Sequence, residues 1–232
     1  PTHPQLLDWL ATEGVEKGWS LKQMHKLLMT SNVFMMSSAA VDKSLAADPA
    51  NELFWRFNMR RLSAEEIRDS ILAVNGGINL KYLGPSFYPE VPREVLQTSS
   101  RPGGVYRKSP PAEQGRRSVY IFIKRSLIPP MMSTHDLADT DSSCAVRFTT
   151  TVPTQALTML NSKFLNDQAG VFSSYLQKKA GDDVKEKVRI ALNRVFCREP
   201  VKEEIDGCVK LIKDFQAEDK FSAEQAFKYF CL

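Results

Sequence analysis

The residues best suited to chemistry lie in one stretch, from Gly115 to Asn161. Four arginines in this stretch could hold an anion: Arg116, Arg117, Arg125 and Arg147. Seven basic residues stand against one acidic residue between positions 101 and 125, a local balance of +6 that exceeds the +4 of the whole chain. Guanidinium groups bind carboxylate, phosphate or sulfate through paired hydrogen bonds. The stretch therefore predicts an anion site. The alternative is that the arginines pair with nearby aspartates or with helix C-termini.

A histidine and three carboxylates follow the arginines, at His135, Asp136, Asp139 and Asp141. Clustered carboxylates can bind calcium, but the spacing lacks the glycine and terminal glutamate of an EF-hand loop. His135 has the chemistry of a general acid or base, with Asp136 beside it. Solvated loop carboxylates that turn the chain are the other interpretation. We expect no metal in this chain.

The end of the stretch predicts a helix start. Thr151, Thr154 and Gln155 surround Pro153, and a threonine cap with an early proline is typical of a helix N-terminus. Free amides at such a start can bind an anion. We therefore add these three residues to the arginines, His135 and Asp136 as candidate ligand-binding residues.

Helices must position this stretch. Apolar spacing predicts helices over 4–17, after Ser20, and from Ser63 to Gly76, where Ser63 and Glu66 form a capping box. Further helices are predicted over 153–161, 162–179, from Asp182, from Pro200 and over 222–232. Residues 118–124 (SVYIFIK) predict a strand, paired with 104–107 or 144–149. The fold class is mainly α: helical hairpins with a long irregular insertion carrying a small β element.

The predicted organisation is a single domain over 1–232. It comprises N-terminal helices over 1–78, an irregular and β segment over 79–150, and C-terminal helices over 151–232. The prolines between 79 and 114 exclude long regular elements there. Residues 51–61 interleave Phe54, Trp55 and Phe57 with arginines, which suits either base stacking or, at helical spacing, an amphipathic segment with arginine stems over a core. We favour the amphipathic segment.

Composition narrows the function classes. The 232 residues are 43% apolar and 25% charged, a balance typical of a globular protein. A net charge of +4 is too weak to indicate nucleic acid, and no apolar run reaches the roughly 18–20 residues of a membrane span. The four cysteines form no Cys-x-x-Cys pair and no haem-attachment motif. Buried thiols are favoured, with a disulfide between Cys197 and Cys208 as the alternative.

Several motifs together carry a family resemblance: HPQLLDWLA, GWSLKQMHKLLMTS, RRLSAEEIRDSILAVNGG, RRSVYIFIKR and VPTQALTMLN. In this order they resemble the C-terminal domain of unknown function, a planctomycete-specific PSD-type domain, of planctomycete secreted proteins that contain a cytochrome c domain. The resemblance implies an export signal, an upstream haem c domain of the same chain as partner, and an extracytoplasmic location at the periplasm or cell surface. It also implies that the protein continues past Leu232. It supplies no catalytic residues.

Two hypotheses for function follow. The first is a non-catalytic docking, assembly or ligand-binding module of an extracytoplasmic haem-containing multidomain protein. The second is an enzyme domain acting on anionic polysaccharide, sulfated polysaccharide included, in which the arginines hold the anion and His135 or Asp136 moves protons. The first hypothesis is favoured because no complete catalytic set can be assembled from the sequence. The enzyme hypothesis requires Arg116, Arg125, His135 and Asp136 to converge in one pocket, whereas the first does not.

Overall fold

The structure is a computed structural model that describes residues 2–97 and 106–232. Within these residues the chain is mainly helical, as predicted, with twelve α-helices and almost no β structure. The chain divides into two compact units, Pro1–Arg61 and Leu62–Leu232, and each is described by itself. None of the helices in the described part of the chain is both long enough and apolar enough to span a membrane.

The first unit contains three helices: α1 (Pro4–Glu16), α2 (Leu21–Met29) and α3 (Asp42–Ala47). Helices α1 and α2 form where the sequence predicts them, and the Ser20 hydroxyl accepts a hydrogen bond from the amide of Gln23 at the start of α2. None of the three helices contains a buried residue. Residues 51–61 form no helix, so the prediction of a helical amphipathic segment there was wrong.

The second unit contains nine helices among its described residues. They are α4 (Ala64–Val74), α5 (Arg93–Gln97), α6 (Pro111–Gln114), α7 (Pro130–Thr134), α8 (Pro153–Asn161), α9 (Lys163–Ala180), α10 (Val184–Phe196), α11 (Lys202–Ala217) and α12 (Ala223–Phe230). Two caps differ from the sequence prediction: Asp183, not Asp182, caps α10, and α11 begins after Val201 rather than at Pro200.

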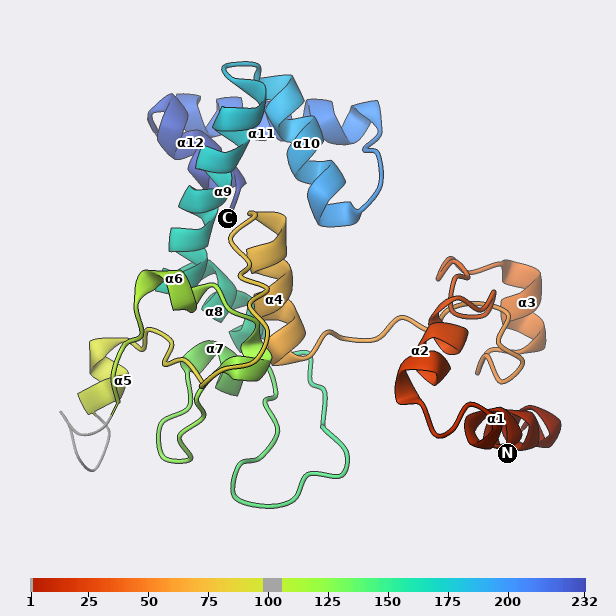
Figure 1. Ribbon diagram of the computed structural model, residues 1–232. Helices are drawn as coiled ribbons and strands as arrows, with labels where there is room; N and C mark the ends of the chain where they lie inside the picture. Colours follow the sequence, from red (N-terminus) through yellow and green to blue (C-terminus); the bar gives the residue numbers. More distant parts are fainter. Residues whose placement is uncertain (1, 98–105) are drawn as a thin grey trace. The chain divides into compact units, whose positions relative to one another are not determined.

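The core of the second unit lies where α10, α11 and α12 gather around one half of α9 (Figure 1). Its most buried side chains are Leu176 and Val188, both with no exposed surface, together with Phe227 and Ile212. Each comes from a different helix whose apolar residues recur at helical spacing, so the four helices bury one shared set of faces. Cys208 and Cys231 pack against this core, whereas Cys144 and Cys197 are exposed, and all four are free thiols. The prediction of buried thiols therefore fails for the exposed pair.

Helix α4 connects this core to the proline-rich middle of the chain. Its capping box is confirmed: Ser63 accepts from the amide of Glu66, whose carboxylate accepts from the amide of Ser63. At its other end, Arg194 of α10 donates to the carbonyl oxygens of residues 73 and 74 at 2.8 and 2.6 Å. A cation at a helix C-terminus satisfies carbonyls that have no partner within the helix.

The predicted strand over 118–124 is not formed. Ser118–Tyr120 is instead one turn of 3₁₀ helix, and among the described residues only isolated bridges join Asn79 to Arg116, Phe87 to Ile121 and Lys124 to Leu127. A strand needs a partner of similar length. The segment that contains Phe87 and meets Ile121 carries prolines at 85, 89 and 92, which have no amide to donate. Of the two expected partners, 144–149 forms no bridge, and 104–107 lies partly outside the described residues.

Candidate functional site

The predicted anion-binding arginines do not converge. Arg116 is 1% exposed, and its guanidinium donates to the carbonyl oxygens of Leu83 and Pro85, both at 2.7 Å. It also lies 3.3 Å from the Glu113 carboxylate and stacks over the Tyr120 ring at 4.1 Å. These hydrogen bonds hold the proline-rich segment in place, a structural role that differs from the predicted alternative of pairing with aspartates or helix C-termini.

The other three predicted arginines lie at the surface, each beside its own carboxylate. The pairs are Arg117 with Asp69 at 3.9 Å, Arg125 with Asp141 at 2.9 Å, and Arg147 with Glu65 at 2.7 Å. Burial alone would raise the pKa of Glu65, but the hydrogen bond and charge of Arg147, together with hydrogen bonds from its own backbone amide and from Ser63, outweigh burial and leave the pKa below its ordinary value. Surface pairs of this kind contribute little to stability, and they leave no shared arginine site.

Two of the candidate ligand-binding residues, Asp136 and Gln155, lie side by side. Asp136 has a left-handed backbone (φ 59°), and its carboxylate accepts from the amide and the hydroxyl of Thr150 at 2.7 and 3.0 Å. Gln155 is 5% exposed and donates to the carbonyl oxygen of Thr134 at 3.2 Å and to Asp136 at 3.4 Å. These bonds fix the entry to α8, whereas Thr151 and Thr154 are exposed to solvent.

His135 is buried at 4% exposure beside this cluster. Its Nδ1 lies 2.9 Å from the carbonyl oxygen of Met131, and because a carbonyl oxygen can only accept, Nδ1 carries a proton and donates it. Its Nε2 is buried without a hydrogen-bond partner among the described residues. A general acid or base must reach the proton that it transfers. Because Nε2 of His135 is enclosed by protein, it cannot exchange a proton with a substrate that arrives from solvent in this conformation.

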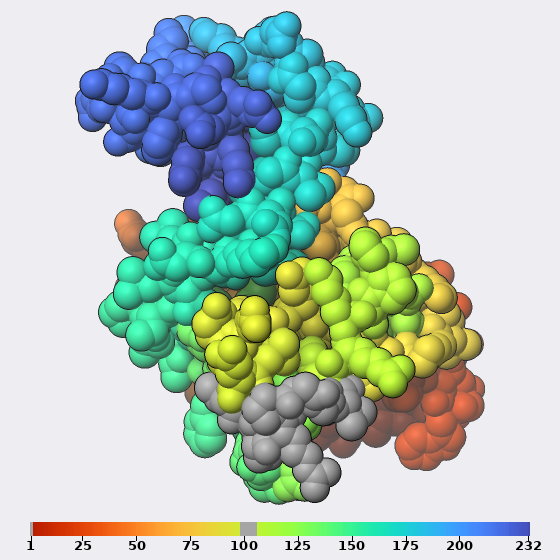
Figure 2. All heavy atoms as spheres, turned by 90° about the vertical axis from the view of Figure 1, so that its left-hand side faces the viewer, coloured from red at the N-terminus to blue at the C-terminus, as the bar shows by residue number. Residues whose placement is uncertain are grey.

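A cavity of about 680 Å³ lies elsewhere in the second unit and contains none of the predicted site residues. Its walls come from α4, the segment before α5, α6, α7 and the junction of α8 with α9. Figure 2 shows residues 85–97 (yellow) beside the start of α9 (teal), and both segments contribute lining residues to the cavity. A volume of this size is typical of small-molecule sites.

The cavity lining is mostly apolar. It includes five prolines, two methionines and four larger apolar side chains: Pro89, Pro92, Pro111, Pro129, Pro130, Met131, Met132, Leu72, Ile121, Phe164 and Val171. Met132 is 2% exposed and Leu72 3%, so these side chains are anchored in the protein interior. Prolines hold their backbone angle fixed. The wall is therefore preformed and does not depend on a ligand for its shape.

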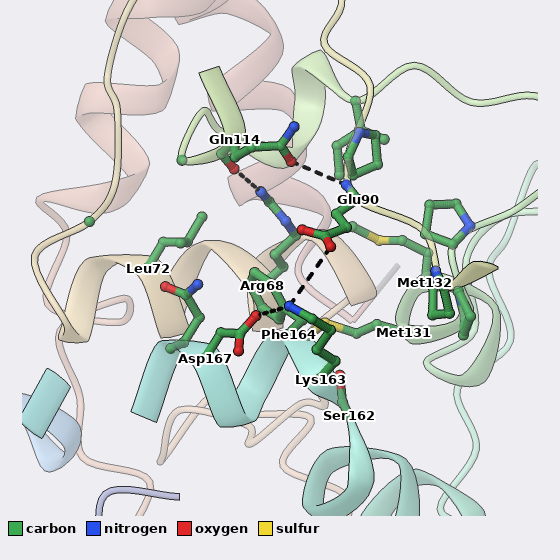
Figure 3. A pocket seen from close by; sticks show the side chains of 18 of the residues that line it. Arg68, Leu72, Glu90, Gln114, Met131, Met132, Ser162, Lys163, Phe164 and Asp167 are labelled. Carbon is green, nitrogen blue, oxygen red and sulfur yellow. Dashed lines mark hydrogen bonds and ion pairs between the residues drawn. The ribbon is translucent and has the colours of Figure 1, made fainter. Parts of the chain in front are cut away.

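Arg68 supports one wall of the cavity (Figure 3). It is 5% exposed and donates to the carbonyl oxygens of Gln114 and Arg116 and to the hydroxyl of Ser118. Burial lowers the pKa of Arg68 to about 10, while the nearby Asp69 acts in the opposite direction. The side chain thereby attaches residues 114–118 to α4. This role is structural, because the hydrogen bonds of the guanidinium go to these protein acceptors.

Three charged residues frame the cavity opening in Figure 3. Lys163, the first residue of α9, lies 2.5 Å from the Asp167 carboxylate and 3.8 Å from that of Glu90. The hydrogen bond from Lys108 lowers the pKa of Glu90, which burial would raise. Together with Arg68, the lining carries two cations and two anions, so its net charge is zero.

Sequence reasoning missed this cavity because no motif joins its walls. The prolines belong to separate segments, and their convergence depends on tertiary packing. One signal was present: Arg68 precedes Leu72 by four residues and therefore lies on the apolar face of α4. A charged residue on an apolar face needs hydrogen-bond partners in the protein interior. The position of Arg68 therefore indicated that polar groups of another segment pack against α4 there.

The described residues contain no group of three or more histidine, cysteine, aspartate or glutamate side chains able to hold a metal ion. Neither the curated proteins nor the solved structures provide a match to the chain. Residues 1–212 match one family, PSD1, described as a protein of unknown function (DUF1553). Because the match spans most of its 232 residues, the chain belongs to the PSD1 family of proteins of unknown function.

Proposed function

We propose that this chain is a non-catalytic ligand-binding module, and that its site is the cavity between α4, the proline-rich segment and α9. The observation that carries the proposal is this cavity of about 680 Å³, with a preformed apolar wall and a charged rim. Ligand sites are typically concave, mainly apolar and supplied with a few polar groups that orient the ligand. The cavity has each of these properties.

The lining indicates an uncharged ligand with a mainly apolar body. Arg68 is engaged by carbonyl oxygens, and Lys163 lies between two carboxylates, so neither cation is left for an anionic ligand. Thr158, Asn161 and Gln168 line the side formed by α8 and α9. Their hydroxyl and carboxamide groups are the kind that orient a neutral ligand through hydrogen bonds.

The wider setting of the module rests on the resemblance found in the sequence. We place it in an extracytoplasmic multidomain protein, with haem c on an upstream cytochrome c-like domain of the same chain. The sequence has no Cys-x-x-Cys-His motif, so covalent haem attachment would occur outside these 232 residues. Detection of a covalently attached haem in the full-length protein from its native host would support this setting, and a full-length protein without haem would contradict it.

The alternative, an enzyme domain for anionic polysaccharide, requires Arg116, Arg125, His135 and Asp136 to meet in one pocket. Arg116 instead binds backbone carbonyls, Arg125 binds Asp141 at the surface, and His135 is enclosed. None of these four lines the cavity. The geometry therefore favours binding over catalysis.

The test is a binding screen with a variant that fills the cavity. Neutral apolar compounds, carboxylate analogues of the same compounds, and neutral and sulfated glycans would be screened against the 232-residue chain by thermal shift and by chemical-shift mapping. Val171 lines the cavity and is 45% exposed, so Val171→Trp can occupy the space without entering the core. Lys178→Trp, an exposed substitution on the same helix outside the cavity, is the control.

We expect neutral apolar compounds to shift resonances of the cavity walls in the parent chain and in Lys178→Trp. Val171→Trp should weaken this binding at least about tenfold, because the indole ring competes for the same space. Binding confined to sulfated glycans, or binding that Val171→Trp leaves unchanged, would contradict the proposal. A complete absence of binding in the screen would count against it as well.

A further inference from the structure

The first unit has a hollow of its own, a groove of about 600 Å³ lined only by residues between His25 and Asn58. Its apolar surface includes Leu28, Phe34 and Phe57, and the two phenylalanine rings meet edge to face at 5.5 Å. Aromatic edges and faces of this kind accept a further apolar or aromatic group. No aspartate or glutamate is among the described residues that line the groove.

One side of the groove is a loop whose backbone is held by its own side chains. The carboxylate of Asp48 accepts from two backbone amides at 3.0 and 2.9 Å, and its carbonyl accepts from the Trp55 indole at 2.8 Å. Asn51 is 4% exposed with a left-handed backbone (φ 56°). Its side chain accepts from the amide of Arg56 and donates to the carbonyl of Arg56 at 2.8 Å. The position of Arg56 is therefore fixed before any ligand binds.

The guanidinium of Arg56 is an uncompensated charge in this groove. It is half-buried and stacks on the Trp55 ring at 4.7 Å. Its Nε atom is buried without a hydrogen-bond partner, and no carboxylate among the described residues lies within ion-pair distance. Nε itself is enclosed, but the two terminal nitrogens of the guanidinium are not enclosed and have no hydrogen-bond partner among the described residues, so a ligand in the groove can supply their acceptor. A carboxylate fits this need, because its two oxygens match the paired donors of a guanidinium.

We propose that the groove binds a small apolar carboxylic acid, with its carboxylate on Arg56 and its aromatic or aliphatic body against Phe34 and Phe57. The charge complementarity carries this assignment, since a neutral ligand can offer a hydrogen-bond acceptor but leaves the positive charge of the arginine uncompensated. Nucleic acid fits less well, because recognition of phosphates needs a dense basic face and Arg56 is the only arginine or lysine among the described lining residues. The proposal is independent of the cavity in the second unit.

The experiment compares two probes that differ in charge and little in shape, 3-phenylpropionate and 3-phenylpropionamide. Binding to the 232-residue chain would be measured at neutral pH by calorimetry and by chemical-shift mapping, including the Nε–H resonance of Arg56. We expect the carboxylate to bind at least about tenfold more tightly than the amide, from a charge-assisted hydrogen bond that only the carboxylate makes. We also expect it to shift resonances of residues 25–58.

Arg56→Gln should remove the preference for the carboxylate, whereas Lys43→Gln, an exposed charge change outside the groove, should keep it. Arg56→Lys keeps the charge but loses the paired donors, so it should retain a reduced preference for the carboxylate. If Arg56→Gln fails to fold, Arg56→Lys is the variant that tests the proposal. Equal affinity for the two probes, a preference that survives in Arg56→Gln, shifts confined to the second unit, or no binding of either probe would each overturn the proposal.

Discussion

Replacing Arg68 with methionine tests whether a buried charge holds the loop beside the cavity. Arg68 is 5% exposed and donates to the carbonyls of Gln114 and Arg116 and to the hydroxyl of Ser118. Hydrogen bonds from a charged donor contribute about 1.5–3 kcal/mol each, or about 4.5–9 kcal/mol for three. Burial opposes them: it lowers the pKa of Arg68 from 12.5 to about 10, which at about 1.36 kcal/mol per unit corresponds to about 3.4 kcal/mol.

The difference between these terms predicts that Arg68→Met lowers the free energy of unfolding by about 1–6 kcal/mol. Methionine keeps most of the apolar stem, so the loss comes from the three acceptors left without a donor. The measurement is urea unfolding followed by circular dichroism.

The control for this prediction is Arg117→Met. The Arg117 side chain is 56% exposed and lies 3.9 Å from the Asp69 carboxylate. Because surface ion pairs contribute little, this change should alter the free energy of unfolding by less than about 1 kcal/mol. If Arg68→Met costs no more than Arg117→Met, the buried hydrogen bonds do not outweigh the desolvation of the guanidinium, and the reasoning fails.

Two further predictions concern glycine positions and pH. Gly115→Ala should destabilise the protein by about 1–3 kcal/mol, because its new Cβ would lie 2.4 Å from the carbonyl oxygen of Gly77. Gly207→Ala, inside α11 with no atom within 4 Å of the new Cβ, should stabilise it by about 0.5–1 kcal/mol; urea unfolding compares the two, and effects of the same sign would contradict this account. The hydrogen bond from Arg198 lowers the pKa of Glu204 from 4.5 to about 2. Its stabilisation is therefore complete above pH 4.5 and is lost as the pH falls through about 2. Glu204→Gln should flatten the fall in thermal midpoint across that range, and a slope equal to that of the parent chain would refute the assignment.

The helices were predictable because their signals are local. Ser63 and Glu66 stand three residues apart, and that spacing alone brings the hydroxyl and the carboxylate onto each other's amides. The same is true of Ser20 at the start of α2 and of the apolar stripes on α9 and α10. Such signals involve atoms within one helical turn, so they do not depend on where the helix packs.

The strand prediction failed because β structure depends on a second segment. Residues 118–124 have a strand composition, but their neighbour in space, the segment around Phe87, contains prolines at regular short intervals. One bridge forms at Phe87, with hydrogen bonds on both sides of it, and the ladder goes no further. The amino-acid composition of a segment indicates whether that segment can form a strand, but it does not show whether another segment can pair with it.

The sequence by itself determined the mainly helical class, most helix boundaries and the family. Tertiary structure decided which charges are available. Arg116 and Arg68 lie among backbone carbonyls from distant segments, and Arg56 has no acidic partner within ion-pair distance in the described part of the chain, although all three are equally basic in the sequence. The reason is physical: a helix is specified by contacts between near neighbours, whereas a cavity and the pairing of a buried charge depend on segments that meet only after the chain has folded.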